Sequence, residues 1–182
     1  MINFLKKFKL SPQWSLTLLA ISSCAIAAAP TLTLAGSNSG LTIFSGVERK
    51  DILDYYLQYG GAPYQRDRYK LYISSKQLTQ GASKFYISYP ANFDGQFKTE
   101  QIEVRVKDKV IPLKNPVVWD KESRFVEIDL AEPIPPKSKV EIVFSNVTNP
   151  NFGTYYFVAD AMAAGDIPVR TYIGTWIISI NR

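Results

Sequence analysis

The chain has 182 residues, of which 46% are hydrophobic and 13% aromatic, so its composition excludes an intrinsically disordered protein and is typical of a folded, β-rich domain. It contains no histidine and only one cysteine, Cys24, which removes the commonest general base, the commonest metal ligand and any disulfide within the chain. The formal net charge is +5, but without Lys6, Lys7 and Lys9 near the N-terminus it is about +2, which argues against a nucleic-acid-binding protein.

The first 35 residues have the pattern of a secretory signal peptide. Three lysines precede an uncharged run over residues 16–29 that ends in small residues and is shorter than the roughly 20 apolar residues of a spanning helix. We expect residues 1–35 to be removed on export to the periplasm, the outer envelope or the extracellular space. Residues 36–182 should then form a single domain with no spanning helix. Residues 21–24 loosely fit the box at which lipoproteins are acylated on cysteine, so a lipid-anchored envelope assembly factor is an alternative.

The segment that follows is predicted to contain an extended arm or first strand over residues 41–47 and then one short helix. Asp51 stands where a helix N-cap would, and the next apolar residues have helical spacing: Ile52, Leu53, Tyr56 and Leu57. Gly60-Gly61 should end this helix.

From Arg68 onward the hydrophobic period changes to two, which indicates strands. The clearest strand has Ile102, Val104 and Val106 on one face and charged residues on the other. Further strands are expected over residues 69–73, 84–89, 126–130, 140–144, 154–159 and 175–180. About seven or eight short strands separated by turn signals predict an all-β, immunoglobulin-like antiparallel β-sandwich.

No motif for catalysis or for binding a metal or cofactor is present, so we expect a non-enzymatic protein without a cofactor. An envelope hydrolase or carbohydrate-acting enzyme that uses carboxylates is the alternative. It would require a pair such as Asp51 and Glu103 to converge in a closed cleft.

Tyrosines are densest between residues 55 and 72, where they are interleaved with basic residues. Exposed tyrosines bury a large area on binding and stack on sugars, and arginine pairs with carboxylates. The segment could therefore hold an envelope glycan or a partner protein, and the candidate binding residues are Tyr55, Tyr59, Tyr64, Arg66 and Arg68. The structural alternative is that the tyrosines cap the core of the sandwich.

Two C-terminal stretches carry a resemblance to a known family: Asn149-Pro150-Asn151-Phe152-Gly153-Thr154-Tyr155-Tyr156-Phe157, and residues 164–175. Together with the leader and the tyrosine-containing segment, they resemble a cyanobacterial secreted family, domain of unknown function 2808. Ala163 stands where that family often has proline. The resemblance implies export and a sandwich fold, but no activity and no site residues. From their Gly and Pro content, we expect the two stretches to have a mainly structural role in turns.

Overall fold

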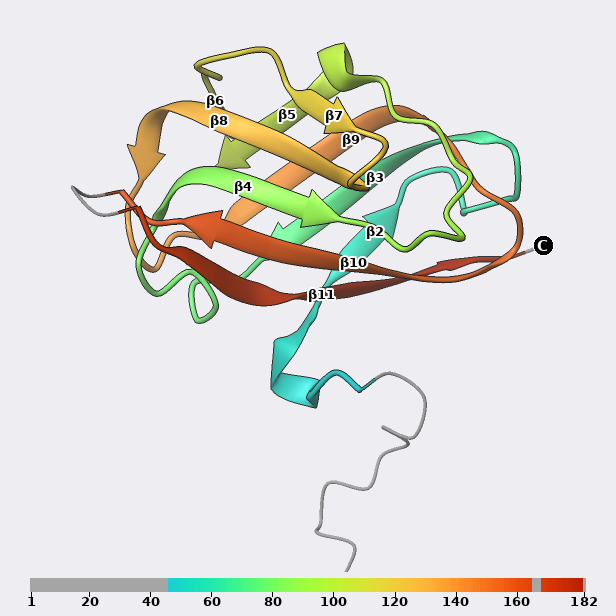
Figure 1. The fold of residues 1–182 in the computed structure, drawn as a ribbon, viewed down its shortest axis with the longest axis horizontal. Helices are drawn as coiled ribbons and strands as arrows, with labels where there is room; N and C mark the ends of the chain where they lie inside the picture. Colours follow the sequence, from blue (N-terminus) through green and yellow to red (C-terminus); the bar gives the residue numbers. More distant parts are fainter. Residues whose placement is uncertain (1–45, 165–167, 182) are drawn as a thin grey trace, which may run out of the picture. The chain divides into compact units, whose positions relative to one another are not determined.

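The computed structural model describes residues 46–164 and 168–181 (Figure 1). The predicted signal peptide, Cys24 and most of the predicted arm lie outside the described residues. Within the described part of the chain, no helix is long and apolar enough to cross a membrane.

The described residues form two facing β-sheets, and Figure 1 shows sheet A in front of sheet B. Sheet A has the strand order β1 (Ile52–Leu53), β11 (Arg170–Ile180), β10 (Gly153–Met162), β4 (Ala82–Ser88), β8 (Phe125–Ile134) and β7 (Val118–Asp120). Sheet B has the order β2 (Tyr55–Leu57), β3 (Arg66–Ile73), β9 (Val140–Thr148), β5 (Ile102–Val106) and β6 (Lys109–Ile111). Strand β1 pairs with β11 in parallel, and the other strand pairs of the two sheets are antiparallel.

This architecture confirms the predicted immunoglobulin-like β-sandwich. In the described part of the chain, seven strands have five or more residues: β3, β4, β5, β8, β9, β10 and β11. Each of them contains a segment whose alternating or β-rich pattern predicted a strand. The four strands of two or three residues are too short to carry a pattern of their own.

The predicted short helix is wrong. Only Arg49–Asp51 is helical, as one 3-10 turn (η2), and the residues that follow form β1 and β2. The chain passes from sheet A to sheet B at Asp54, so Ile52–Leu53 pairs with β11 and Tyr55–Leu57 pairs with β3. A helix this short is only marginally stable by itself, and pairing with two sheets outweighs the helical spacing. Gly60-Gly61 does form a turn, and both glycines have positive φ.

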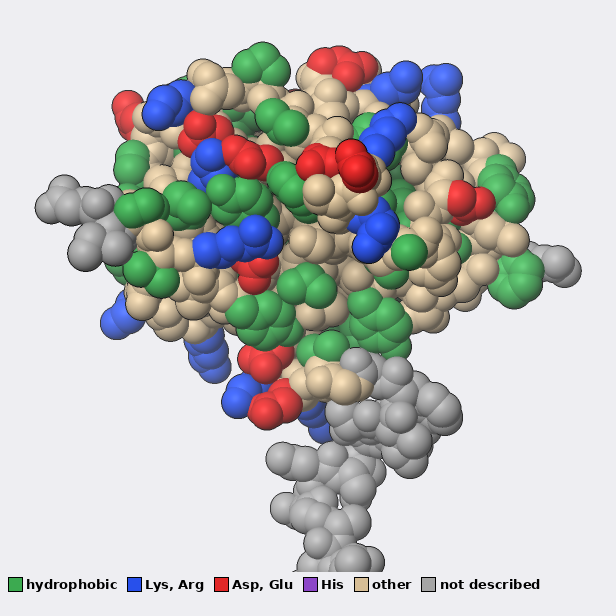
Figure 2. Space-filling view, in the orientation of Figure 1, with side chains coloured by type: hydrophobic (Ala, Val, Ile, Leu, Met, Phe, Trp, Pro, Cys, Tyr) green, Lys and Arg blue, Asp and Glu red, His purple; other side chains and the backbone are tan. Residues whose placement is uncertain are grey.

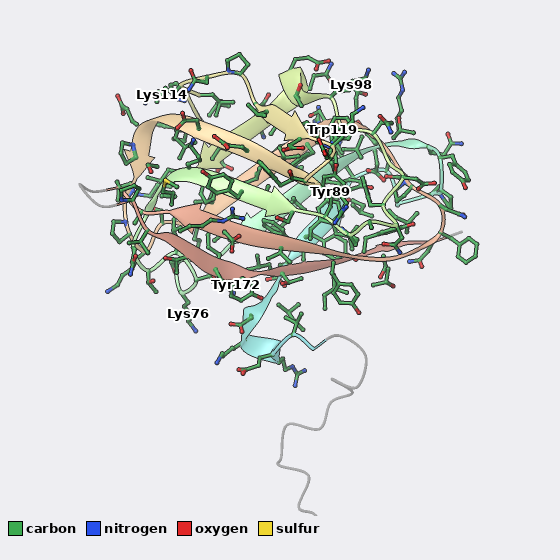
Figure 3. The ribbon with its side chains drawn as sticks, in the orientation of Figure 1. Lys76, Tyr89, Lys98, Lys114, Trp119 and Tyr172 are labelled. Carbon is green, nitrogen blue, oxygen red and sulfur yellow. The ribbon has the colours of Figure 1, made fainter. Side chains whose placement is uncertain are left out.

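The core lies between the sheets and confirms the inward face predicted for β5. Val104 is 0% exposed, whereas Arg105 lies on the outer face and forms an ion pair of 2.7 Å with Glu103. Close to the loops that follow β4 and β9, the core is built from packed aromatic rings: Tyr89, Phe93, Phe97, Trp119, Phe144, Tyr155 and Phe157. Trp119 Nε1 donates a hydrogen bond of 2.8 Å to the Tyr89 hydroxyl (Figure 3).

The outer face of sheet A carries charges of both signs, interspersed with hydrophobic side chains (Figure 2). Lys84 on β4, for example, pairs with Glu127 on β8 and lies 4.0 Å from Asp129. Such a face is solvated and roughly neutral, which agrees with the small net charge calculated for residues 36–182.

Candidate functional site

Three of the five candidate binding residues lie on strands β2 and β3, and the other two lie on the loop between these strands. Tyr55 is half-buried, and its hydroxyl accepts a hydrogen bond of 3.0 Å from the backbone N–H of Ser179 on β11. Tyr55 therefore ties β2 of sheet B to β11 of sheet A. Arg66 and Arg68 point outward from β3, as the burial pattern of that strand shows. Arg68 Nε donates a hydrogen bond of 3.1 Å to Ser145 Oγ on the neighbouring strand β9.

The other two candidates, Tyr59 and Tyr64, lie on the loop of residues 58–65 that joins β2 to β3. Their side chains are 63% and 61% exposed, which makes them the most exposed aromatic residues in the described part of the chain. Tyr64 has a φ of +60°, in the left-handed region, which is rarely occupied by bulky residues. Strained backbone of this kind persists only where the surrounding structure holds it.

A buried carboxylate holds the first half of this loop. Asp67 is 1% exposed and faces inward from β3. Its Oδ1 accepts hydrogen bonds from the backbone N–H groups of Tyr59 (2.9 Å) and Arg68 (2.7 Å), and its Oδ2 accepts one from Gly61 (2.8 Å). Gly61 has a φ of +70°, and a Cβ there would lie 2.7 Å from Leu57 Cδ1, so the turn favours glycine.

A buried amide holds the second half of the loop. Asn149 Nδ2 donates to the Ala62 carbonyl (2.8 Å), and the Asn149 backbone N–H donates to the Gln65 carbonyl (2.9 Å). Its Oδ1 accepts a hydrogen bond of 2.7 Å from the Tyr69 hydroxyl inside the core. Burial raises the pKa of Tyr69 well above its usual range, so this hydroxyl stays a donor. The predicted structural role of the C-terminal signature is thus confirmed for Asn149.

The loop of residues 149–152 lies beside the tyrosine-bearing loop and exposes another aromatic ring, Phe152, at 59%. This loop is also fixed: the Asn151 backbone N–H donates to Asp94 Oδ1 (3.1 Å), and the Tyr155 hydroxyl donates to the Asn151 carbonyl (2.9 Å). Burial, and to a lesser extent the charge of Asp94, raises the pKa of Tyr155. An open hollow of about 450 Å³ adjoins the loop and is lined by Phe152, Gly153, Thr154, Ile180 and Asn181.

We refer to the exposed Tyr59 and Tyr64 and the outward-pointing Arg66 and Arg68, which follow one another along the chain, as the tyrosine surface. It offers two aromatic faces and two cations on a backbone that the core holds in place. The alternative catalytic pair is not brought together: Asp51 precedes β1 of sheet A, whereas Glu103 lies on β5, three strands from β2 in sheet B and paired with Arg105. Among the described residues there is no group of three or more acidic, histidine or cysteine side chains that could hold a metal ion.

Sequence reasoning missed Asp67, and it assigned Asn149 a structural role in a turn without linking it to the loop of residues 58–65. A signal for Asp67 was present, because the alternation Asp67, Tyr69, Leu71 and Ile73 places a carboxylate on the inward face of a predicted strand. A carboxylate in that position must find hydrogen-bond donors. The contacts of Asn149 left no comparable signal, since its partners Tyr69 on β3 and Ala62 in the loop before β3 lie 80 and 87 residues away.

Comparison with known proteins gives a family match and a set of remote structural similarities. The family described as "Protein of unknown function (DUF2808)" matches residues 41–180. No curated protein sequence matches the chain.

The solved structures that resemble the fold share little sequence with it. BslA, a bacterial hydrophobin, is 16% identical with a TM-score of 0.45, over 71% of this chain and 92% of its own. An uncharacterised immunoglobulin-like protein from Nocardia farcinica is 10% identical with a TM-score of 0.45, over 72% of this chain and 99% of its own. The collagen-binding domain of a Staphylococcus aureus adhesin is 8% identical with a TM-score of 0.38, over 71% of this chain and 97% of its own.

Proposed function

The chain belongs to the DUF2808 family of proteins of unknown function, and we propose that it is an exported, non-enzymatic protein of the cell envelope whose tyrosine surface binds a partner. Export is supported by the basic start, the short apolar run and the small residues of positions 1–35. The resemblance to a secreted cyanobacterial family supports the same location, in the periplasm or the outer envelope. The partner is a glycan or another protein of that envelope.

The observation that carries this proposal is the combination of exposed aromatic side chains with a fixed backbone. Tyr59 and Tyr64 contribute little buried area to the fold, yet Asp67 and Asn149 hold their loop with hydrogen bonds to five backbone groups in residues 59–68. Ordering a loop costs conformational entropy, and a loop that is already ordered does not incur that cost when it binds. Rigid tyrosines are also effective anchors because they bury much area with few torsions.

The structural interpretation of the tyrosines applies to other members of the same segment. Tyr69 is completely buried, and Tyr55 bonds to strand β11 of sheet A. Replacing either residue should therefore destabilise the fold. The sequence left a binding role and a structural role open for these tyrosines. We assign the binding role to Tyr59 and Tyr64 only and the structural role to Tyr55 and Tyr69.

The test is the retention of envelope components by the immobilised, processed protein. We expect the double variant Tyr59→Ala/Tyr64→Ala to lose the retained component while its melting temperature stays within a few degrees of the parent's. Tyr172→Ala is the matched control, because Tyr172 is an exposed tyrosine of β11, outside the tyrosine surface. Equal retention by parent and double variant, or equal loss in the control, would contradict the proposal.

A further inference from the structure

We propose that the partner of the tyrosine surface is an acidic polysaccharide, bound by stacking of its sugar rings on Tyr59 and Tyr64 and by pairing of its anionic groups with Arg66 and Arg68. This inference rests on the proposed binding function and adds the chemical class of the ligand. The anionic group is a carboxylate or a sulfate ester, which present the same oxygen acceptors to a guanidinium.

The positively charged side chains on the outer face of sheet B are not all balanced by acidic neighbours. Lys70 lies 3.9 Å from Glu141, and Arg105 lies 2.7 Å from Glu103, so these two charges are balanced within the sheet. Arg66 and Arg68 form no ion pair with any described residue, although they lie on the same face as Lys70. The face is therefore neutralised in its middle and left positive where it meets the tyrosine-bearing loop.

The geometry of the two arginines suits a chain with repeated negative charges. Both point outward from β3 two residues apart, which separates their positions by about 7 Å along the strand. The hydrogen bond from Arg68 Nε to Ser145 Oγ fixes that guanidinium and leaves its terminal nitrogens for a ligand. A guanidinium held in this way can pair with a planar carboxylate through two parallel hydrogen bonds.

The surroundings of the tyrosines favour a glycan over a protein. A protein interface is centred on a continuous, dehydrated apolar patch. The chain neighbours of the two rings are polar, although the exposed Phe152 lies on the adjacent loop: Gln58 Nε2 lies 3.4 Å from the Tyr59 hydroxyl, and the exposed Gln65 follows Tyr64. Single aromatic faces separated by hydrogen-bonding groups match the alternating apolar faces and hydroxyl edges of a sugar chain.

Affinity electrophoresis of the processed protein tests the inference directly. The gels contain polygalacturonate for the carboxylate source, dextran sulfate for the sulfate source, or neutral dextran. We expect retardation by one or both acidic polymers and none by dextran, and the stronger acidic polymer identifies the anionic group. Arg66→Gln/Arg68→Gln should weaken the binding at least tenfold, and added salt should weaken it further. Arg124→Gln, at an exposed arginine outside the tyrosine surface, is the control that removes one positive charge elsewhere and should bind like the parent.

Three results would overturn the inference. Equal retardation by dextran would show that the anionic groups of the polymer have no role in binding. Equal weakening of binding in Arg124→Gln would show that only the net charge of the protein matters. Retention of an envelope protein through Tyr59 and Tyr64, without retardation by any polysaccharide, would also overturn it while leaving the proposed binding function in place. If the folded parent protein retained no envelope component and was retarded by no polysaccharide, the proposed binding function itself would be contradicted.

Discussion

Asp67 offers the sharpest test of how the tyrosine surface is held. Asp67→Ala removes the acceptor of three backbone N–H groups, of which that of Gly61 is buried and those of Tyr59 and Arg68 are part-buried. A buried donor left without a partner costs about 1–3 kcal/mol, whereas a part-buried one can turn to water at a smaller cost. Because the variant also removes a carboxylate that is itself expensive to bury, we expect a net loss of about 2–4 kcal/mol in the free energy of unfolding.

Denaturant titration measures this loss, and amide hydrogen exchange locates it. The Gly61 amide should lose its protection in Asp67→Ala, while amides of β9 and β10 change only with the global stability. Asp94→Ala is the control, since the exposed Asp94 accepts a single hydrogen bond, from Asn151, and its loss should cost less than about 1 kcal/mol. If Asp67→Ala were as stable as Asp94→Ala, the buried carboxylate would not hold the loop and the argument for a preformed surface would fail.

Three further predictions concern the core, a buried hydroxyl and processing. Val104→Asp should leave the domain unfolded because it buries an unpaired charge, whereas Arg105→Ser should cost only about 0.5 kcal/mol with the loss of the surface pair to Glu103; circular dichroism separates the two, and equal tolerance would refute the register of β5. The pKa of Tyr69 is raised above its usual value of 10.0, so its protonated form stabilises the fold fully below that pH and loses this contribution as the pH rises beyond it. Tyr69→Phe should therefore be less stable at neutral pH, because Asn149 Oδ1 loses its donor, but show a weaker decline in alkali; an unchanged alkaline decline would contradict this assignment. Mass spectrometry of the exported protein should find an N-terminus between Ala28 and Gly36, and an intact Met1 in the membrane fraction would refute processing.

The fold was largely predictable, because a strand with one buried face shows a hydrophobic period of two in the sequence and turn residues mark its ends. Ile102, Val104 and Val106 show this pattern without ambiguity, and the structure places their side chains toward the core. The predicted helix failed because spacing alone does not distinguish a helix from two short strands that belong to different sheets. Only the pairing partners of Ile52–Leu53 and Tyr55–Leu57, more than 100 residues away for β11, decide between them.

The candidate site was predictable as a segment but not as a surface. Composition identified the tyrosines and arginines between residues 55 and 72, and it could not separate the half-buried Tyr55 from the exposed Tyr59 and Tyr64. That division depends on strand register and on the loop conformation set by Asp67 and Asn149. Hydrogen bonds between residues so distant in the sequence leave no periodic trace in it.

The substitution Tyr64→Gly tests most directly whether the exposed tyrosines serve binding instead of folding. Glycine relieves the strain of the left-handed φ of +60° at this position, but it also increases the conformational entropy of the unfolded chain. The tyrosine side chain that is removed is mostly exposed, so little buried area is lost. The free energy of unfolding should therefore stay within about 1 kcal/mol of the parent's, while retention of the envelope component falls at least tenfold on the same preparation. A variant that loses several kcal/mol of stability, or one that retains the component as well as the parent does, would contradict the assignment of this surface to binding.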